Sequence, residues 1–329
     1  MCKECKNEYD NPEDRRFHAQ PIACDKCGPK VTLEKISKFK DQIQPELIWE
    51  QLDKIKNLFL NDKIIAIQGI GGFHLACNAK NHEIIEKLRL LKNRYEKPFA
   101  VMGKDIEMIK RYCFVTKSEN KLLISSESPI VLLKKRNIDY LPKNIAPGQK
   151  RLGFMLPYSP IHKLLFHEID FPLLMTSANL SDEPQCTSVE EVRERLNGIA
   201  NYIFWHERKI INRLDDSVVQ INRKKLVTYR RARGFAPSPI KLPPGFYNQQ
   251  YGIGLGAEIK NTFCLLNKGD LILSPHLGDL SEGRVDIEFR SQVKKFLDMY
   301  RIDPNWVSTD LHPDYLSLIH ISEPTRLRR

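Results

Sequence analysis

The sequence predicts a mixed α/β (α+β) protein that begins with a small metal-binding knuckle. Between residues 45 and 240, apolar runs of strand length are interleaved with amphipathic helical segments, a pattern typical of helices packed on a sheet. Two CxxC pairs occur among the first 30 residues. From residue 250, short apolar runs separated by glycine turns predict hairpins. A chain of 329 residues has room for about two or three such units.

The cysteine pairs Cys2/Cys5 and Cys24/Cys27 are separated by 18 residues. Two residues between cysteines let both thiolates face one ion, and a second pair completes a tetrahedral site, so the spacing favours structural zinc. Two disulfides or a redox CxxC are the alternatives. His18 is a rival ligand, but four thiolates already fill a closed site, so we expect it to pack against its neighbours instead.

Periodicity predicts the segments that follow. Ile48, Leu52, Ile55 and Phe59 recur at helical spacing, and the run from residue 64 to 67 predicts a buried strand that ends in a glycine turn. The glycines at 69, 71 and 72 do not match GxGxxG, so a Rossmann site is not indicated. Further helices are predicted in HEIIEKLRLLKNR and VEEVRERLNGI, and strands in KPFAVM, PIVLLKK and PLLMTSAN.

The pattern changes after a proline-rich stretch, residues 236–245, which we expect to be a linker. Hairpins are predicted over residues 251–280, where Asn-Lys-Gly-Asp separates two apolar runs. An amphipathic helix follows, with an apolar face made by Val285, Phe289, Val293, Phe296 and Tyr300. The segment NWVSTDLHP predicts a last strand.

Composition narrows the class of protein. Hydrophobic residues make up 41% of the chain and charged residues 28%, and no apolar run reaches the length of a membrane span. The four cysteines outside the knuckle are scattered, which indicates reduced thiols and a cytoplasmic location. The net charge of +11 is compatible with nucleic acid, an anionic substrate or a lysine-rich surface.

Three groups of polar residues stand at the ends of predicted elements. They are Lys92 with Arg94; Thr176, Ser177 and Asn179; and Arg213 and Asp215 with Arg230, Arg231 and Arg233. Each group alone has an ordinary explanation: a basic helix end, a set of turns and caps, and an internal ion pair. Ammonium and guanidinium groups bind phosphate oxygens, and hydroxyls and amides donate to them. Together the three groups therefore predict an anionic nucleotide site.

The order of motifs along the chain resembles the HypF family, the carbamoyltransferases that mature nickel–iron hydrogenases. The likeness runs from Cys2 to Ser317. It is carried by EYDNPEDRRFHAQPIACDKCGP, GIGGFHLAC, KPFAVM, MLPYSPIHKLL, TSANLSDEP, RLDDSVV, RRARGFAP, GLGAEIKNTFCL, SPHLGDL and DLHPDYLS. The long cysteine motif and GAEIKNTF in this order are the most specific of these.

The resemblance implies a division of the chain. We expect a zinc knuckle at 1–35, a YrdC-like domain with a twisted mixed sheet at 45–240, and the first part of an actin/hexokinase-type (RNase H-like) ATPase domain at 250–317. Family members carry further domains on both sides, so we expect this chain to be an internal fragment. Residues 318–329, where the likeness ends, are expected to be an artefactual tail.

The resemblance also implies a reaction. The YrdC-like domain of the family joins carbamate, derived from carbamoyl phosphate, to ATP, and the last domain passes the carbamoyl group to the C-terminal cysteine of the partner HypE. Lys92, Arg94, Ser177 and Asn179 match the residues that hold the ATP phosphates, bridged by magnesium, and the acyl group. Thr176, Arg213, Asp215, Arg231 and Arg233 are expected to support them. Lys260, Asn261 and Thr262 are expected to form a nucleotide loop in the last domain.

The sequence departs from the family pattern at three positions. Gln68 stands where the family usually has lysine, Asn78 replaces an aspartate and Ala232 replaces a serine. The loss of the lysine is expected to weaken anion binding.

Two other functions remain open at this point. A YrdC-type threonylcarbamoyl-adenylate synthase of tRNA modification would share the middle domain but would lack both the knuckle and GAEIKNTF. A basic, zinc-bearing module that binds RNA, including double-stranded RNA, is compatible with the charge. It is not favoured, because aromatic residues are not interleaved with a basic stripe.

Overall fold

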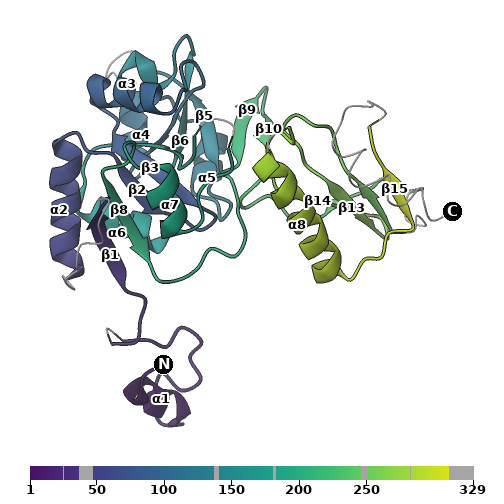
Figure 1. Ribbon diagram of the computed structural model, residues 1–329, viewed down its shortest axis with the longest axis horizontal. Helices are drawn as coiled ribbons and strands as arrows, with labels where there is room; N and C mark the ends of the chain where they lie inside the picture. Colours follow the sequence, from purple (N-terminus) through teal and green to yellow (C-terminus); the bar gives the residue numbers. More distant parts are fainter. Residues whose placement is uncertain are drawn as a thin grey trace.

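The computed structural model describes residues 1–24, 26–36, 47–136, 141–180, 183–245, 251–281 and 283–310. Figure 1 shows three parts in chain order: a small N-terminal knuckle, a large sheet covered by helices, and a smaller sheet with one long helix. The mixed α/β class predicted from the sequence is confirmed. No helix in these ranges has both the length and the apolar character needed to cross a bilayer.

The knuckle is built around one short helix, α1 (Lys3–Asp10), whose N-cap is Cys2. Arg16 closes the following loop by pairing with Glu8 at 2.6 Å and donating to the carbonyl of Ala23 at 2.7 Å. After the second cysteine pair, β1 (Val31–Lys35) joins the edge of the large sheet. The predicted knuckle segment 1–35 therefore ends in a strand that belongs to the next unit by its hydrogen bonds.

The large sheet has ten strands in the order β1-β8-β2-β3-β7-β4-β6-β5-β9-β10. The pairs β2–β8, β4–β6 and β5–β9 are parallel and the other pairs are antiparallel. The strands after β1 are β2 (Ile65–Gln68), β3 (Phe73–Asn78), β4 (Ala100–Met102), β5 (Ile130–Lys134), β6 (Arg151–Met155), β7 (Leu173–Ser177), β8 (Tyr202–His206), β9 (Val218–Asn222) and β10 (Lys225–Arg230).

Helices cover both faces of this sheet, because its central strands are apolar on both sides. In β2, Ile65 and Ile67 pack into one core and Ala66 into the other. The first core is closed by α2 (Ile48–Leu60) and α6 (Pro160–Glu168). The second is closed by α3 (His82–Leu91), α4 (Ile106–Tyr112), α5 (Lys117–Leu123) and α7 (Val189–Arg195), near a 3-10 turn, η1 (Lys143–Ile145).

The smaller sheet has the order β11-β14-β13-β12-β15 and carries α8 (Gly283–Tyr300). Val285, Phe289 and Phe296 of α8 are buried against it, as their spacing predicts. The predicted hairpin is β13–β14, and its turn residues Lys268 and Gly269 both have positive φ, 47° and 90°, as a type I′ turn requires. The strands are β11 (Ile240–Lys241), β12 (Gly252–Gly254), β13 (Cys264–Asn267), β14 (Asp270–Leu273) and β15 (Trp306–Ser308).

Two predictions concern the ends of this unit, and the structure describes only the first of the two segments. The proline-rich stretch expected to be a plain linker contains β11, which pairs with β14. Most of the DLHPDYLS motif and the tail at 318–329 lie outside the described residues.

Candidate functional site

The four knuckle cysteines converge on one point. The Sγ atoms of Cys2 and Cys24 are 3.6 Å apart, those of Cys24 and Cys27 3.9 Å, and those of Cys27 and Cys5 3.7 Å. A tetrahedron with metal–sulfur bonds of about 2.3 Å has edges of about 3.8 Å, so the spacing suits zinc. The His18 ring stacks on Tyr9 with a centroid distance of 4.9 Å and lies tilted against Phe17 at 4.1 Å, and it is not part of the cluster.

Lys92 is the centre of the second cluster. It is the residue after α3, only 1% exposed, and its ammonium group reaches the end of β7. It donates to the carbonyl oxygens of Ser177 and Asn179, both at 2.6 Å, and to Oδ1 of Asn179 at 3.0 Å. Burial, reinforced by the charge of Arg94, lowers the pKa of Lys92 well below its ordinary value. Two residue groups that are 85 positions apart in sequence thus form one site.

Arg94 lies beside this centre on the loop that follows α3. Its Nη1 is 3.4 Å from the hydroxyl of Thr176, and its Nη2 donates to the carbonyl of Pro98 at 2.7 Å. The loop itself is shaped by Arg89, a buried residue that the sequence did not single out. Arg89 donates to the carbonyls of Arg94, Tyr95 and Lys97 at 2.7, 3.1 and 3.1 Å. The only sign of this residue in the sequence was its position on the same predicted helix, one turn before Lys92.

The third predicted group is divided between two networks. In the first, Asp216 accepts from Arg233 at 3.0 Å and faces Nε2 of His74 at 3.1 Å. Burial opposes ionisation of Asp216, but its hydrogen bonds and electrostatic interactions with His74 and Arg233 outweigh it and lower its pKa below the ordinary value. Arg233 also lies 3.5 Å from the ring centroid of Tyr158. In β3, His74 stands directly opposite Ser177 of β7, so the network adjoins the Lys92 cluster.

Arg233 has its remaining donors engaged as well. Nη1 and Nη2 donate to the carbonyls of Glu127 and Ser128 at 3.1 and 2.8 Å. Arg231 donates to the carbonyl of Ser238 at 2.7 Å, while its Nη1 is buried without a hydrogen-bond partner among the described residues. The structure therefore gives Arg233 internal contacts. A phosphate contact by either arginine remains a prediction.

The second network links the two sheets. Arg213 and Asp215 do not pair with each other, which was the ordinary explanation for their spacing. Arg213 binds Glu288 of α8 at 2.6 Å, and Asp215 binds His276 at 3.0 Å and Arg230 at 3.5 Å. Glu288 and His276 both belong to the second unit, so these two contacts cross the junction between the units.

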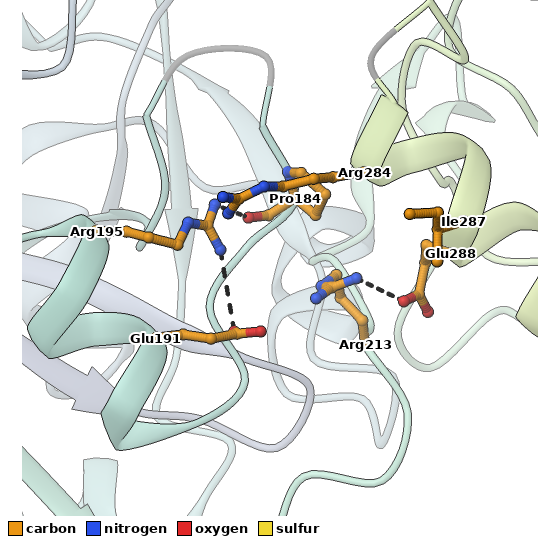
Figure 2. Close-up of a pocket in the computed structure, with 7 residues that line it drawn as sticks. All are labelled: Pro184, Glu191, Arg195, Arg213, Arg284, Ile287 and Glu288. Atoms are coloured by element: carbon orange, nitrogen blue, oxygen red, sulfur yellow. Dashed lines mark hydrogen bonds and ion pairs between the residues drawn. The ribbon is translucent and has the colours of Figure 1, made fainter.

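A cavity of about 290 Å³ lies at this junction. Figure 2 shows Arg195 and Glu191 of α7 on one side and Ile287 and Glu288 of α8 on the other, with Arg213 between them. The complete lining is Pro184, Glu191, Arg195, Arg213, Arg284, Ile287 and Glu288.

Lys260, Asn261 and Thr262 lie between β12 and β13, in the second unit. Asn261 is 1% exposed and its Nδ2 donates to the carbonyls of Leu255 and Ala257 at 2.9 and 2.6 Å, so it closes this loop. Lys260 is exposed with φ of 51°. The nucleotide role of these three residues remains a prediction.

The structure shows the environment of each of the three residues that depart from the family pattern. The Gln68 amide accepts from the backbone of His206 and donates to the carbonyl of Arg208, both at 2.8 Å, which ties β2 to the end of β8. Lysine has no acceptor and cannot make the first of these bonds. Asn78 accepts from the backbone of Lys80 at 3.0 Å, a contact that aspartate can also make. Ala232 is fully buried.

Family models match the chain in three consecutive stretches. Residues 1–34 match the model described as "HypF finger", and residues 248–326 match "HypF Kae1-like domain". Residues 57–232 match the model of the Sua5, YciO and YrdC proteins, described as "Telomere recombination". The fold and these three matches thus define a protein with a YrdC-like α/β unit between a cysteine finger and a Kae1-like unit.

Individual relatives agree with this composition. "Carbamoyltransferase HypF" of Rhodobacter capsulatus is 39% identical over 320 residues, covering 97% of this chain and 42% of that protein. The protein of the same name from Synechocystis is 40% identical, covering 96% and 47%. A crystal structure of full-length HypF in the phosphate- and nucleotide-bound form superposes with a TM-score of 0.88 at 43% identity, covering 98% of this chain and 41% of the other.

The chain belongs to the HypF family. It spans less than half of the length of these two HypF relatives. Its middle unit is also similar to "Threonylcarbamoyl-AMP synthase" of Homo sapiens, at 30% identity over 132 residues, which cover 40% of this chain and 47% of that protein. The structure of P. abyssi Sua5, at 15% identity and a TM-score of 0.53 over 81% of this chain and 89% of that one, shares the fold.

Proposed function

We propose that this chain supplies the ATP-using step of a carbamoyltransferase in hydrogenase maturation. In this proposal the YrdC-like unit binds ATP with magnesium and joins it to carbamate derived from carbamoyl phosphate. The observation that supports it most is the convergence of Lys92 and Arg94 with Ser177 and Asn179 at the end of β7. The HypF solved in a phosphate- and nucleotide-bound form aligns with 98% of this chain, which supports a nucleotide as ligand.

The proposed step is attack of a carbamate oxygen on the α-phosphorus of ATP. A new oxygen–phosphorus bond forms, the bond to the β-phosphate oxygen breaks, and pyrophosphate leaves with that electron pair. The products are carbamoyl-adenylate and pyrophosphate, so the protein needs no nucleophile of its own. Its task is to hold the reactants and to stabilise negative charge. Lys92 and Arg94 provide the positive charge, and Ser177 and Asn179 orient the phosphates and the acyl group.

The four thiolates of the knuckle are proposed to hold one zinc ion. Cys2, Cys5, Cys24 and Cys27 provide a closed set of ligands, so the ion would be structural and would not take part in the reaction. The carbamoyl group is proposed to pass afterwards to the C-terminal cysteine of HypE. That transfer belongs to the complete family protein, of which this chain covers only a part.

A second candidate is threonylcarbamoyl-AMP synthesis, favoured by the 30% identity of the middle unit to the human synthase over 132 residues. The finger and the Kae1-like unit favour the first candidate. Exchange of labelled pyrophosphate into ATP separates the two. We expect exchange that depends on carbamoyl phosphate or carbamate; exchange that needs L-threonine and bicarbonate would favour the synthase.

ATP titration of the chain and of Arg94→Ala tests the site itself. Loss of a charged donor to phosphate is expected to lower ATP affinity by about tenfold to a hundredfold, or about 1.5–3 kcal/mol. Arg111→Ala is the matched control, because Arg111 is an exposed arginine on α4. If Arg94→Ala binds ATP as tightly as Arg111→Ala, ATP does not bind at this cluster.

A further inference from the structure

The orientation of the Asn179 side-chain amide is set by contacts to both its oxygen and its nitrogen, and the contact to the nitrogen comes from outside the Lys92 cluster. Its Oδ1 accepts from the ammonium of Lys92 at 3.0 Å and from the hydroxyl of Ser177 at 2.7 Å. Its Nδ2 donates to the main-chain carbonyl of Glu183 at 2.5 Å. A flipped amide would place an NH2 group against the ammonium and two amide acceptors against each other. The Glu183 carbonyl therefore favours, together with the Lys92 ammonium, the orientation in which Lys92 and Ser177 keep their acceptor.

Arg195, the last residue of α7, holds Glu183 in place. Its Nε and Nη2 donate to Oε2 of Glu183 at 3.1 and 2.6 Å, and Nη2 also donates to the carbonyl of Pro184 at 2.6 Å. The Arg195 side chain is only 7% exposed. Figure 2 shows it pointing from α7 towards Pro184, with Glu191 of the same helix beside it. One guanidinium group thus fixes both the side chain and the backbone of this segment.

The same segment is held independently on its other side. Arg213 donates from Nε to the carbonyl of Gln185 at 2.8 Å, and Gln185 is itself 4% exposed. Two arginines therefore anchor three consecutive residues, 183–185, directly behind the Asn179 amide. Arg193, two residues before Arg195, instead pairs with Glu34 of β1 at 2.7 Å.

We propose that Arg195 is a positioning residue for the ATP site: by holding Glu183 and Pro184 it fixes the carbonyl that turns the Asn179 amide oxygen towards Lys92. The inference rests on the proposed function, in which Lys92 and Asn179 contact ATP. Arg195 itself has its donors engaged with protein oxygens and acts only through Asn179.

The test compares ATP affinity in Arg195→Met and in Arg193→Met. Both variants remove a guanidinium group from α7 that is engaged in an ion pair, so both report general destabilisation of the helix. Only Arg195→Met releases Glu183, and we expect its ATP affinity to fall about tenfold, the equivalent of one lost hydrogen bond. Thermal unfolding of both variants shows whether the effect on binding exceeds the effect on stability.

Two additional variants separate positioning from a merely structural role. Glu183→Ala removes the carboxylate partner but keeps the carbonyl, and it should lower ATP affinity to a similar degree. The double variant should then be no weaker than Arg195→Met alone, because Arg195→Met already removes the ion pair that Glu183→Ala removes. Arg195→Lys, which retains one charged donor but not the planar fork, should restore part of the affinity and keeps the test valid if Arg195→Met does not fold.

The outcomes distinguish this inference from the proposed function. If the wild-type chain binds ATP and Arg94→Ala loses affinity, but Arg195→Met binds like Arg193→Met, the positioning role is wrong and the ATP site stands. Additive losses in the double variant also overturn it. If the wild-type chain does not bind ATP at all, the proposed function fails and the positioning role fails with it.

Discussion

His162 is expected to make the stability of the YrdC-like unit sensitive to pH. The side chain lies on α6 and is fully buried, and neither ring nitrogen has a hydrogen-bond partner among the described residues. Its surroundings are the ring of Tyr158 at 4.7 Å and that of His74 at 6.1 Å, with Asp216 and Arg233 beyond. Burial, together with the neighbouring His74, lowers the pKa of His162 to about 3.

The sign and size of the effect follow from that pKa. In the unfolded chain His162 has an ordinary pKa of about 6.5, so between about pH 6.5 and pH 3 the unfolded state binds a proton that the folded state does not. Acid therefore favours unfolding over this range. Between about pH 7 and pH 5 the contribution of His162 to the free energy of unfolding is expected to fall by about 2 kcal/mol.

Urea unfolding followed by far-UV circular dichroism at several pH values measures this change. His162→Leu should lose less stability than the wild type between about pH 7 and pH 5, by about 2 kcal/mol. His167→Leu is the matched control, because His167 is on the same helix but its side chain is 65% exposed. If His162→Leu and the wild type show the same dependence on pH, His162 does not titrate as its burial implies.

The purified chain is expected to hold about one zinc ion by elemental analysis. Cys24→Ser should lose the metal and unfold the knuckle while the YrdC-like unit keeps its own unfolding transition, and a metal-free knuckle with α1 intact would contradict this. Asp216→Asn should lower the free energy of unfolding by about 3–5 kcal/mol in urea denaturation, because Arg233 becomes a buried charge without its partner. Asp286→Asn, which breaks a partly exposed pair on α8, is the control, and an equal effect of the two would count against a buried network. Since the pKa of Asp216 is lowered on folding, its stabilising contribution should be present above about pH 4 and be lost in stronger acid.

Much of the fold was predictable because its signals are local. The helical spacing of Leu52, Ile55 and Phe59 appears as the buried face of α2, and the turn at Lys268 and Gly269 forms the predicted hairpin. The strand β11 was missed because two residues among prolines carry no periodicity. Its existence depends on pairing with β14, about thirty residues further along the chain.

The contacts among the predicted site residues could be anticipated from the sequence only in part. The convergence of Lys92 with Ser177 and Asn179 agrees with the grouping predicted from the order of motifs. Arg213 and Asp215 lie two positions apart, and an ion pair between them was the ordinary explanation for their spacing. In the structure Arg213 pairs with Glu288 and Asp215 pairs with His276. Spacing in the sequence made that pair plausible, but the direction of each side chain in the folded segment turns them towards the second unit.

By itself, the sequence determined the four-cysteine centre, the mixed α/β class and the family to which the chain belongs. Each of these depends on spacing or order that is written along the chain. Only the tertiary structure decided which charges share a network: His74 with Asp216, separated by 142 positions, and Lys92 with Asn179, separated by 87. The physical reason is that a buried charge must find an oppositely charged or hydrogen-bonding partner wherever the fold provides one, and the sheet order that brings β3, β7 and the 213–216 segment together is not visible in any local pattern.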